Sequence, residues 1–245
     1  MNDRPIPTPA LVPAVLVMVG LLGAAALISG GIQRFRLADR YVTVKGVAER
    51  DITADVGIWP LRFTSADNDL DRARRGIEAD RHRVMAFFAR HGIDSTQVEL
   101  QGLEVTDNQA NPYRPGGQDV SRFILTMTLV ARSRDPQRIA VASQAVGELV
   151  AGGVVLSSGP FGGGPTYLFT RLNALKPQML AEATRNARQA AAEFARESGA
   201  HVGSIRRATQ GVFEILPRDQ APGINEGNQI QKTLRVVATM DYDLK

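Results

Sequence analysis

The C-terminal stretch 234-LRVVATMDYDLK-245 carries the clearest structural pattern in the chain. Every second side chain is apolar, at Leu234, Val236, Ala238, Met240, Tyr242 and Leu244. The positions between them include Arg235, Thr239, Asp241 and Asp243. Because successive side chains of a strand point to opposite faces, this alternation predicts a β-strand with one buried and one solvent-facing side.

Upstream of this strand, the chain alternates between segments typical of strands and of helices. β-branched and aromatic residues predict six further strands, at 41–48, 55–64, 97–106, 122–131, 154–158 and 204–216. Apolar residues at helical spacing predict three helices, at 66–91, 135–150 and 172–198. The order ββαββ-αβ-αββ predicts an α+β fold with antiparallel-rich sheets packed against amphipathic helices.

Three positions carry finer expectations. Pro60 lacks an N–H group, so strand 55–64 is predicted to lie at a sheet edge or to contain a bulge. Gly211 is predicted to interrupt strand 204–216. The buried face of the last helix is predicted to comprise Leu172, Leu175, Met179, Ala183, Ala187, Ala190 and Phe194.

The N-terminal region differs in kind, since no charged residue lies between Arg4 and Arg34. Residues 10–32 are mostly apolar, and about 20 helical residues cross a bilayer. We therefore predict a tail at 1–9, a transmembrane helix at 10–32 and a basic juxtamembrane linker at 33–40. The alternative is a cleaved signal peptide, but its apolar region would be shorter, roughly 7–15 residues.

The residues alone leave the orientation of this predicted span open. Arg34, Arg36 and Arg40 follow it, and an excess of arginine marks the cytoplasmic side. That rule weakens where a long domain follows the span.

Composition excludes several classes of function. The 245 residues contain no cysteine, which rules out disulfides, thiol nucleophiles and thiolate metal sites. The net charge is +4, and it falls to +2 from residue 41 onward, because four arginines and two aspartates precede that point. No basic patch is flanked by aromatic residues, so no nucleic-acid partner is predicted.

Two apparent motifs fail on their details. Asp67, Asp69, Asp71 and Glu78 imitate a calcium-binding loop, but Arg72 stands where that loop requires glycine. The segment 157-SSGPFGGGPT-166 lacks the Gly-Lys-Ser/Thr ending of a phosphate-binding loop, and its prolines remove backbone donors. It is interpreted as a connector between a strand and a helix.

The titratable residues indicate no compact active site. His82 and His91 are nine residues apart on one predicted helix and lie on opposite faces, while His201 is remote in sequence. Carboxylates on or near strands, at Glu99, Glu104, Asp107, Asp241 and Asp243, are the candidates for a hydrolase. We predict no catalytic, cofactor-binding or metal-ligating residue.

Several passages resemble the SIMPL-domain family. The opening 41-YVTVKGVAERDITAD-55 is similar to that family's first motif, a strand, a glycine turn and an E-x-x-x-x-x-D passage into the second strand. Gly92-Ile93 followed by 94-DSTQVELQ-101, an alanine-rich helix and the turn at 198–205 match later passages. The resemblance covers nearly all of 41–245, which we take as one SIMPL domain. The Pro/Gly-rich loop at 107–121 departs from the family pattern.

The resemblance implies a bacterial envelope protein linked to stress tolerance, including oxidative stress, without an established enzymatic activity. It also implies a periplasmic C-terminal domain. The anchor predicted at 10–32 departs from many relatives, which carry a cleavable signal, and together with this orientation it predicts a single-pass protein of the inner membrane. Some relatives form ring or channel-like homo-oligomers. We therefore expect a non-enzymatic protein that associates with itself and contacts the bilayer through 10–32. An unidentified envelope protein is a further candidate partner. The alternatives are a periplasmic binding module using loops 107–121 and 217–227, and a carboxylate hydrolase.

Overall fold

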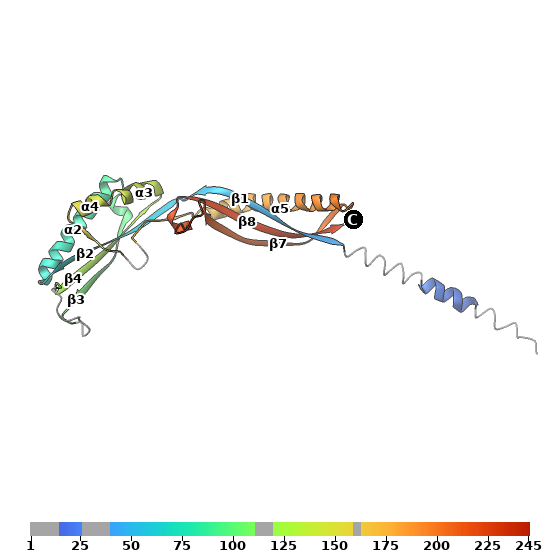
Figure 1. Ribbon diagram of the computed structural model, residues 1–245, viewed down its shortest axis with the longest axis horizontal. Helices are drawn as coiled ribbons and strands as arrows, with labels where there is room; N and C mark the ends of the chain where they lie inside the picture. The colour runs from blue at the N-terminus through green and yellow to red at the C-terminus, as the bar shows by residue number, and fades with distance from the viewer. Residues whose placement is uncertain (1–14, 26–39, 111–119, 159–162) are drawn as a thin grey trace, which may run out of the picture. The chain divides into compact units, whose positions relative to one another are not determined.

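The computed structural model describes residues 15–25, 40–110, 120–158 and 163–245, and they have the predicted α+β fold with antiparallel sheets (Figure 1). The chain divides into two compact units. Unit 1 comprises Met1–Ala48, Leu180–Val212 and Val236–Lys245, and unit 2 comprises Glu49–Met179 and Phe213–Arg235.

One sheet has three strands in the order β1-β8-β7. These strands are β1 (Tyr41–Thr53), β7 (Val202–Pro217) and β8 (Gln231–Leu244). Hydrogen bonds join Thr43 to Asp241 and Thr53 to Gln231, so β1 and β8 run antiparallel. The alternation predicted for the C-terminal strand is confirmed, because the apolar side chains from Leu234 to Tyr242 are buried.

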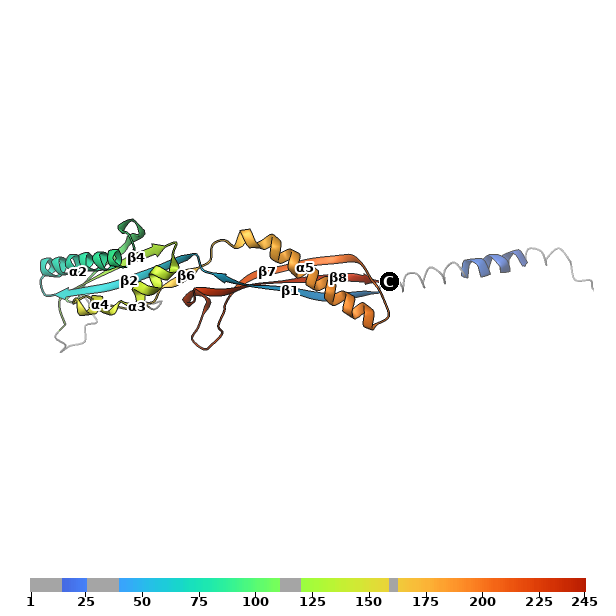
Figure 2. The ribbon, with the colours of Figure 1, turned by 90° about the horizontal axis from the view of Figure 1, so that it is seen from above.

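Helix α5 (Leu172–Glu197) lies along this sheet (Figure 1 and Figure 2). Its buried side chains follow a strict four-residue spacing, at Met179, Ala183, Ala187, Ala191 and Ala195. The prediction that Phe194 belongs to the buried face is wrong, since this side chain is 61% exposed. The small alanine side chains let the helix backbone approach the sheet closely along this row.

Gly46 makes that close approach possible. The glycine turn expected from the family motif is wrong, because β1 continues through Gly46 without a turn. A Cβ atom at Gly46 would overlap the carbonyl oxygen of Ala183 and would lie 2.5 Å from the nitrogen of Ala187. Gly211 likewise does not interrupt β7; a Cβ there would lie 2.7 Å from the carbonyl oxygen of Val237.

The sheet of unit 2 has the order β3-β4-β2-β5, and β6 also pairs with β2. Its strands are β2 (Val56–Asp67), β3 (Val98–Asp107), β4 (Phe123–Ser133), β5 (Val155–Leu156) and β6 (Thr166–Leu168). All of the pairs in this sheet are antiparallel, with Trp59 opposite Ala131 and Phe63 opposite Met127 in β2 and β4.

Helix α2 (Leu70–Arg90) packs on β2 and β4 and closes the core of unit 2 (Figure 2). Trp59 contacts Phe87 and Phe88 edge to face, with ring centroids 6.3 and 5.7 Å apart. Such aromatic contacts add to the stabilisation that comes from burial alone.

The predicted helix 135–150 is two helices, α3 (Pro136–Gln144) and α4 (Gly147–Ala151). The backbone leaves the helical region at Ala145, where ψ is 7°. The strand predicted at 154–158 is reduced to the two residues of β5, and β6 arises in the segment that was interpreted as a connector. Two short 3-10 helices, Ser95–Gln97 and Glu226–Asn228, complete the described elements.

Of the predicted membrane span 10–32, the structure describes residues 15–25, which are helical and exposed. Within the described part of the chain, no helix is both long enough and apolar enough to cross a membrane. The other residues of the predicted span, and most of the linker 33–40, lie outside the described residues.

Candidate functional site

The strand carboxylates considered for a hydrolase do not converge on one site. Glu104 pairs with Arg62 at 2.6 Å in unit 2, whereas Asp241 accepts a hydrogen bond from Thr43 at 2.7 Å in unit 1. Asp243, also in unit 1, accepts one from Ser204 at 3.0 Å. Among the described residues, no three His, Asp or Glu side chains are grouped so that they could hold a metal ion. A local structural partner therefore accounts for Glu104, Asp241 and Asp243, and also for Asp107, which pairs with Arg122 at 3.2 Å.

The carboxylates that imitate a calcium loop organise the start of α2. Asp69 is the N-cap, and its side chain accepts a hydrogen bond from the Arg72 backbone N–H at 2.9 Å. Asp67 accepts from the Arg72 side chain at 3.0 Å and from the Asp69 backbone N–H at 2.8 Å. The Arg72 hydrogen bond is the main cause that lowers the pKa of Asp67. Arginine thus occupies the place of the turn glycine and neutralises the charge.

The histidines occupy separate environments. His91 is the C-cap of α2, and its ring lies 4.6 Å from the Phe87 ring, between centroids. Its Nε2 atom is 3.6 Å from the Glu148 carboxylate. His82 is exposed on α2, and the His201 backbone pairs with Lys245.

Asp55, the aspartate of the E-x-x-x-x-x-D passage, ties the β1–β2 turn to the segment that enters α5. Its carboxylate accepts hydrogen bonds from the Thr170 N–H at 2.8 Å and from Arg171 Nε at 2.9 Å. Burial acts to raise the pKa of Asp55, but the bonds from Thr170 and Arg171 outweigh it and lower this pKa below its usual value. The motif residue therefore has a structural role.

One cavity of unit 2 lies at an opening in the edge of β2. β6 pairs with residues 56–58 of this strand and β5 pairs with residues 63 and 64, so the residues between them have no strand partner on that side. A pocket of about 520 Å³ occupies the opening. Pro60 is one of its lining residues. The predicted edge position of this strand is wrong, because β2 pairs with β4 on one side and with β5 and β6 on the other, but Pro60 lies in the stretch that neither β5 nor β6 pairs with.

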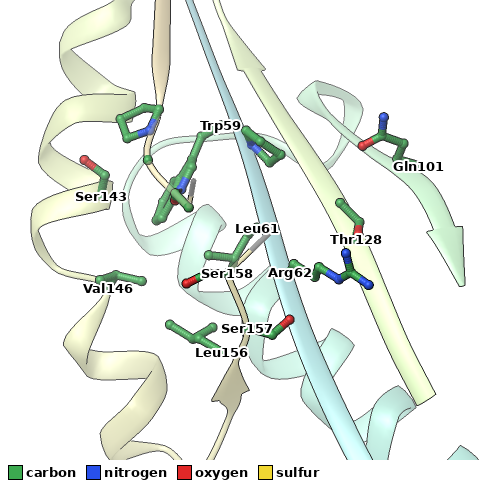
Figure 3. Close-up of a pocket in the computed structure, with 14 residues that line it drawn as sticks. Trp59, Leu61, Arg62, Gln101, Thr128, Ser143, Val146, Leu156, Ser157 and Ser158 are labelled. Carbon is green, nitrogen blue, oxygen red and sulfur yellow. Dashed lines mark hydrogen bonds between the residues drawn. The ribbon is translucent and has the colours of Figure 1, made fainter. Parts of the chain in front are cut away.

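The side of the pocket with Arg62 is polar, and the side with Val146, here called the apolar end, also carries the Ser143 hydroxyl (Figure 3). Ser143 and Val146 of the α3–α4 region lie on one side of Trp59, and Arg62, Thr128 and Gln101 lie on the other. The apolar lining comprises Trp59, Pro60, Leu61, Val146, Leu156 and Pro165. Hydroxyl groups come from Thr128, Ser143, Ser157 and Ser158.

Two contacts hold the pocket walls in place. The Trp59 indole N–H donates to the carbonyl oxygen of Gly163 at 3.1 Å and so links β2 to the segment before β6. Tyr167 of β6 is buried and bonds to Ser143 through its side chain, and burial raises the pKa of the Tyr167 hydroxyl. These two hydrogen bonds fix the segment before β6 and the α3 side of the pocket relative to β2 and β6.

Sequence analysis placed candidate binding regions elsewhere. Neither loop 107–121 nor loop 217–227 contributes a lining residue to this pocket; residues 111–119 lie outside the described residues. The segment 157–166, interpreted as a connector, supplies Ser157, Ser158, Gly163, Gly164 and Pro165. The serines and glycines of this segment are visible in the sequence as an irregular feature. That they line a pocket depends on the break in strand pairing along β2, which the sequence does not show.

Two edge strands form a second set of candidate surfaces. In β3, Leu100, Leu103 and Val105 are 51, 46 and 54% exposed. In β7, Ile205 and Val212 are 49 and 78% exposed. Each strand is paired on one side only within the described sheets. Exposed edges of this kind are templates for pairing with another chain.

The fold and these surfaces define an α+β protein with a small-molecule-sized pocket and edge strands that include β3 and β7. A family model, SIMPL, described as a protein of unknown function (DUF541), matches residues 42–240. The chain therefore belongs to the SIMPL family. A search of the curated proteins found no match.

One solved structure is similar at a low level. It is described as a crystal structure of a hydrolase from Listeria innocua, and it is 13% identical to this chain. The alignment covers 81% of this chain and 92% of that one, with a TM-score of 0.17. A similarity of that size supports no conclusion about fold or activity.

Proposed function

We propose that this SIMPL-family protein is a non-enzymatic scaffold of the bacterial envelope. Residues 10–32 anchor it as a single pass in the inner membrane, and its C-terminal domain lies in the periplasm. There it assembles with copies of itself into a ring or channel-like homo-oligomer that contributes to tolerance of oxidative stress. The absence of cysteine suits such a location, because the fold needs no disulfide to persist under oxidising conditions.

The observation that carries the proposal is the pair of open strand edges, β3 and β7. The apolar residues of β3 face the same side of the sheet as the buried residues of β4, since Leu103 is opposite Met127 and Val105 is opposite Leu125. Helix α2 contacts β2 and β4 but leaves these side chains about half exposed. A strand added at the edge of β3 would satisfy its backbone groups and cover this apolar strip.

Charge favours β7 of a second copy as the added strand. β3 carries Glu99, Glu104 and Asp107 and no basic residue. β7 carries Arg206 and Arg207 against Glu214. Two β3 strands side by side would place like charges together, whereas β3 beside β7 brings opposite charges together. Contact between two different surfaces is heterologous, and such contacts build rings when the rotation closes.

Charge exchange tests this interface. The full chain is purified in detergent, and the mass of the protein part of the particle is measured by light scattering. Wild type is expected to exceed the mass of one chain several-fold. Glu99→Lys and Arg207→Glu should each shift the population toward monomer, and the double variant should restore part of the assembly. Wild-type protein that stays monomeric at every concentration would contradict the proposal.

A reporter tests the membrane topology. The proposal expects alkaline phosphatase fused to the C-terminus to be active, because it folds only in the periplasm. It also expects the protein to stay in the membrane fraction at high salt. A fusion that is active only with a cytoplasmic reporter would reverse the orientation, and release as a shortened soluble protein would support a cleaved signal peptide.

The pocket beside Trp59 favours one further role, that of a periplasmic binding module. This role does not involve β7, and of β3 only Gln101 lines the pocket, so binding and assembly can be tested separately. The separated carboxylates offer no comparable support for a hydrolase.

A further inference from the structure

The opening in the edge of β2 is built into the strand itself. The carbonyl oxygen of Arg62 accepts a hydrogen bond from the Ser157 N–H at 2.9 Å, so the backbone of Arg62 faces β5. Backbone groups two residues apart in a strand face the same side, so Pro60 also faces this side. Proline has no N–H to satisfy, and the sheet edge can stay open there without leaving a donor unpaired. The cavity is therefore compatible with a stable sheet.

The side chains around the opening define the chemistry of an occupant. Val146 and Leu156 provide partly exposed apolar surface next to the buried side chains of Trp59 and Leu61. Thr128 and Gln101 lie near Arg62, whereas the Ser143 hydroxyl lies beside Val146 (Figure 3). Arg62 is the only charged residue among those that line the pocket. A volume of about 520 Å³ lies in the range of pockets that hold small organic ligands.

Arg62 can exchange its present partner. Its guanidinium pairs with Glu104, whose side chain is 70% exposed, while the Arg62 side chain is 29% exposed. An ion pair with so exposed a carboxylate contributes little to stability, because water and salt screen it. A carboxylate held inside the pocket would bind the planar guanidinium through two parallel hydrogen bonds in a less polar setting, which strengthens them.

We propose that this pocket binds a small amphipathic carboxylate. The carboxylate pairs with Arg62 in place of Glu104, near Thr128 and Gln101. The apolar body lies against Trp59 and extends toward Val146. This assignment does not require β7, although Gln101 and Glu104 belong to β3, the other strand used for the proposed assembly. Binding by a monomeric protein would support the pocket and contradict only the assembly.

Trp59 is the only tryptophan in the chain, so its fluorescence reports on the pocket alone. The full chain in a nonionic detergent is titrated with hexanoate, hexanol and acetate as probes. Hexanoate is expected to change the emission of Trp59 in a saturable way. Hexanol lacks the charge and acetate lacks the apolar body, so each should bind at least about tenfold more weakly. Equal responses to hexanoate and hexanol would overturn the proposal, as would the lack of any saturable response.

Variants locate the binding site. Arg62→Gln should weaken hexanoate binding about tenfold or more, and Glu104→Gln should leave it unchanged or strengthen it, because the competing carboxylate is gone. Arg132→Gln removes an arginine of β4 that does not line the pocket, and it should leave binding unchanged. Val146→Phe fills the apolar end and should abolish binding with Arg62 intact, which covers the case of an Arg62 variant that does not fold. Unchanged affinity in folded Arg62→Gln or in Val146→Phe would overturn the assignment.

Discussion

In unit 1, positions with a small side chain or none are as important for packing α5 on β1 as positions that form hydrogen bonds. Gly46 permits the α5 backbone to lie directly on β1, and the small side chains of Ala183 and Ala187 keep the distance between helix and strand short. Asn186 strengthens it by donating to the carbonyl oxygen of Val47 at 2.8 Å. A larger group at Gly46 would have to displace backbone atoms, which cannot rotate away as a side chain can.

Replacement of Gly46 by alanine should therefore destabilise the protein by at least about 2 kcal/mol, since overpacking at a rigid contact costs this much or more. Chemical unfolding of the full chain followed by circular dichroism measures the change. Gly102→Ala is the matched control, because a Cβ at Gly102 in β3 meets no atom within 4 Å. Equal stability of the Gly46 and Gly102 variants would show that α5 does not pack as described.

Asp55 predicts a specific dependence of stability on pH. Its pKa is lower in the folded protein than in the unfolded chain, so the charged form stabilises the fold above the unfolded value of about 3.9. That stabilisation disappears as the pH falls through the folded pKa. The stability difference between wild type and Asp55→Asn should be constant from pH 7 to about pH 5 and should shrink toward pH 3. A difference that is unchanged at pH 3 would contradict the role assigned to Asp55.

For the helices and strands, the local sequence pattern explains some features, and packing between elements explains the others. The alternation in β8 predicts its buried face correctly, because a strand's two faces are set by the chain itself. The same criterion predicts β3 as a strand but not its exposure, which depends on how far α2 extends across the sheet. Phe194 was misplaced because the buried positions of α5 repeat every four residues from Met179 to Ala195, and this row does not include position 194.

The pocket lay beyond sequence reasoning for a similar reason. Its lining comes from β2, β3, β4, the α3–α4 region and the segment around β5 and β6. Pro60 and the glycine-rich segment 157–166 were each visible as irregular features. Only the register, with β5 and β6 pairing at separate places on β2, shows that the two irregularities belong to one cavity.

The start of α2 gives a prediction at the same scale. Asp69→Ala removes the N-cap hydrogen bond to the Arg72 N–H and should cost about 1 kcal/mol of stability. Because arginine takes part in this cluster, millimolar calcium should leave the melting temperature of wild type unchanged. A calcium-dependent rise in melting temperature that Asp69→Ala abolishes would instead assign the cluster to metal binding.

For the whole molecule, the proposed assembly pairs the acidic edge of one copy with the arginine-bearing edge of the next. β3 offers an acidic edge with an apolar strip, and β7 offers a longer edge that carries two arginines. A ring that pairs β3 of each copy with β7 of the next leaves neither edge open. A twofold dimer through β3 alone would leave β7 exposed and would bring acidic residues together.

The most direct test uses the absence of natural cysteine, which makes any introduced thiol unique. Val105→Cys in β3 and Val212→Cys in β7 are made in full-length chains with different tags. They are expressed alone or together and treated in detergent with a thiol crosslinker. The account predicts little crosslinking in either variant alone, mixed-tag dimers on co-expression, and a ladder of higher multimers in the double-cysteine chain. Efficient crosslinking of Val105→Cys with itself, or assembled particles without mixed-tag dimers, would contradict β3–β7 assembly.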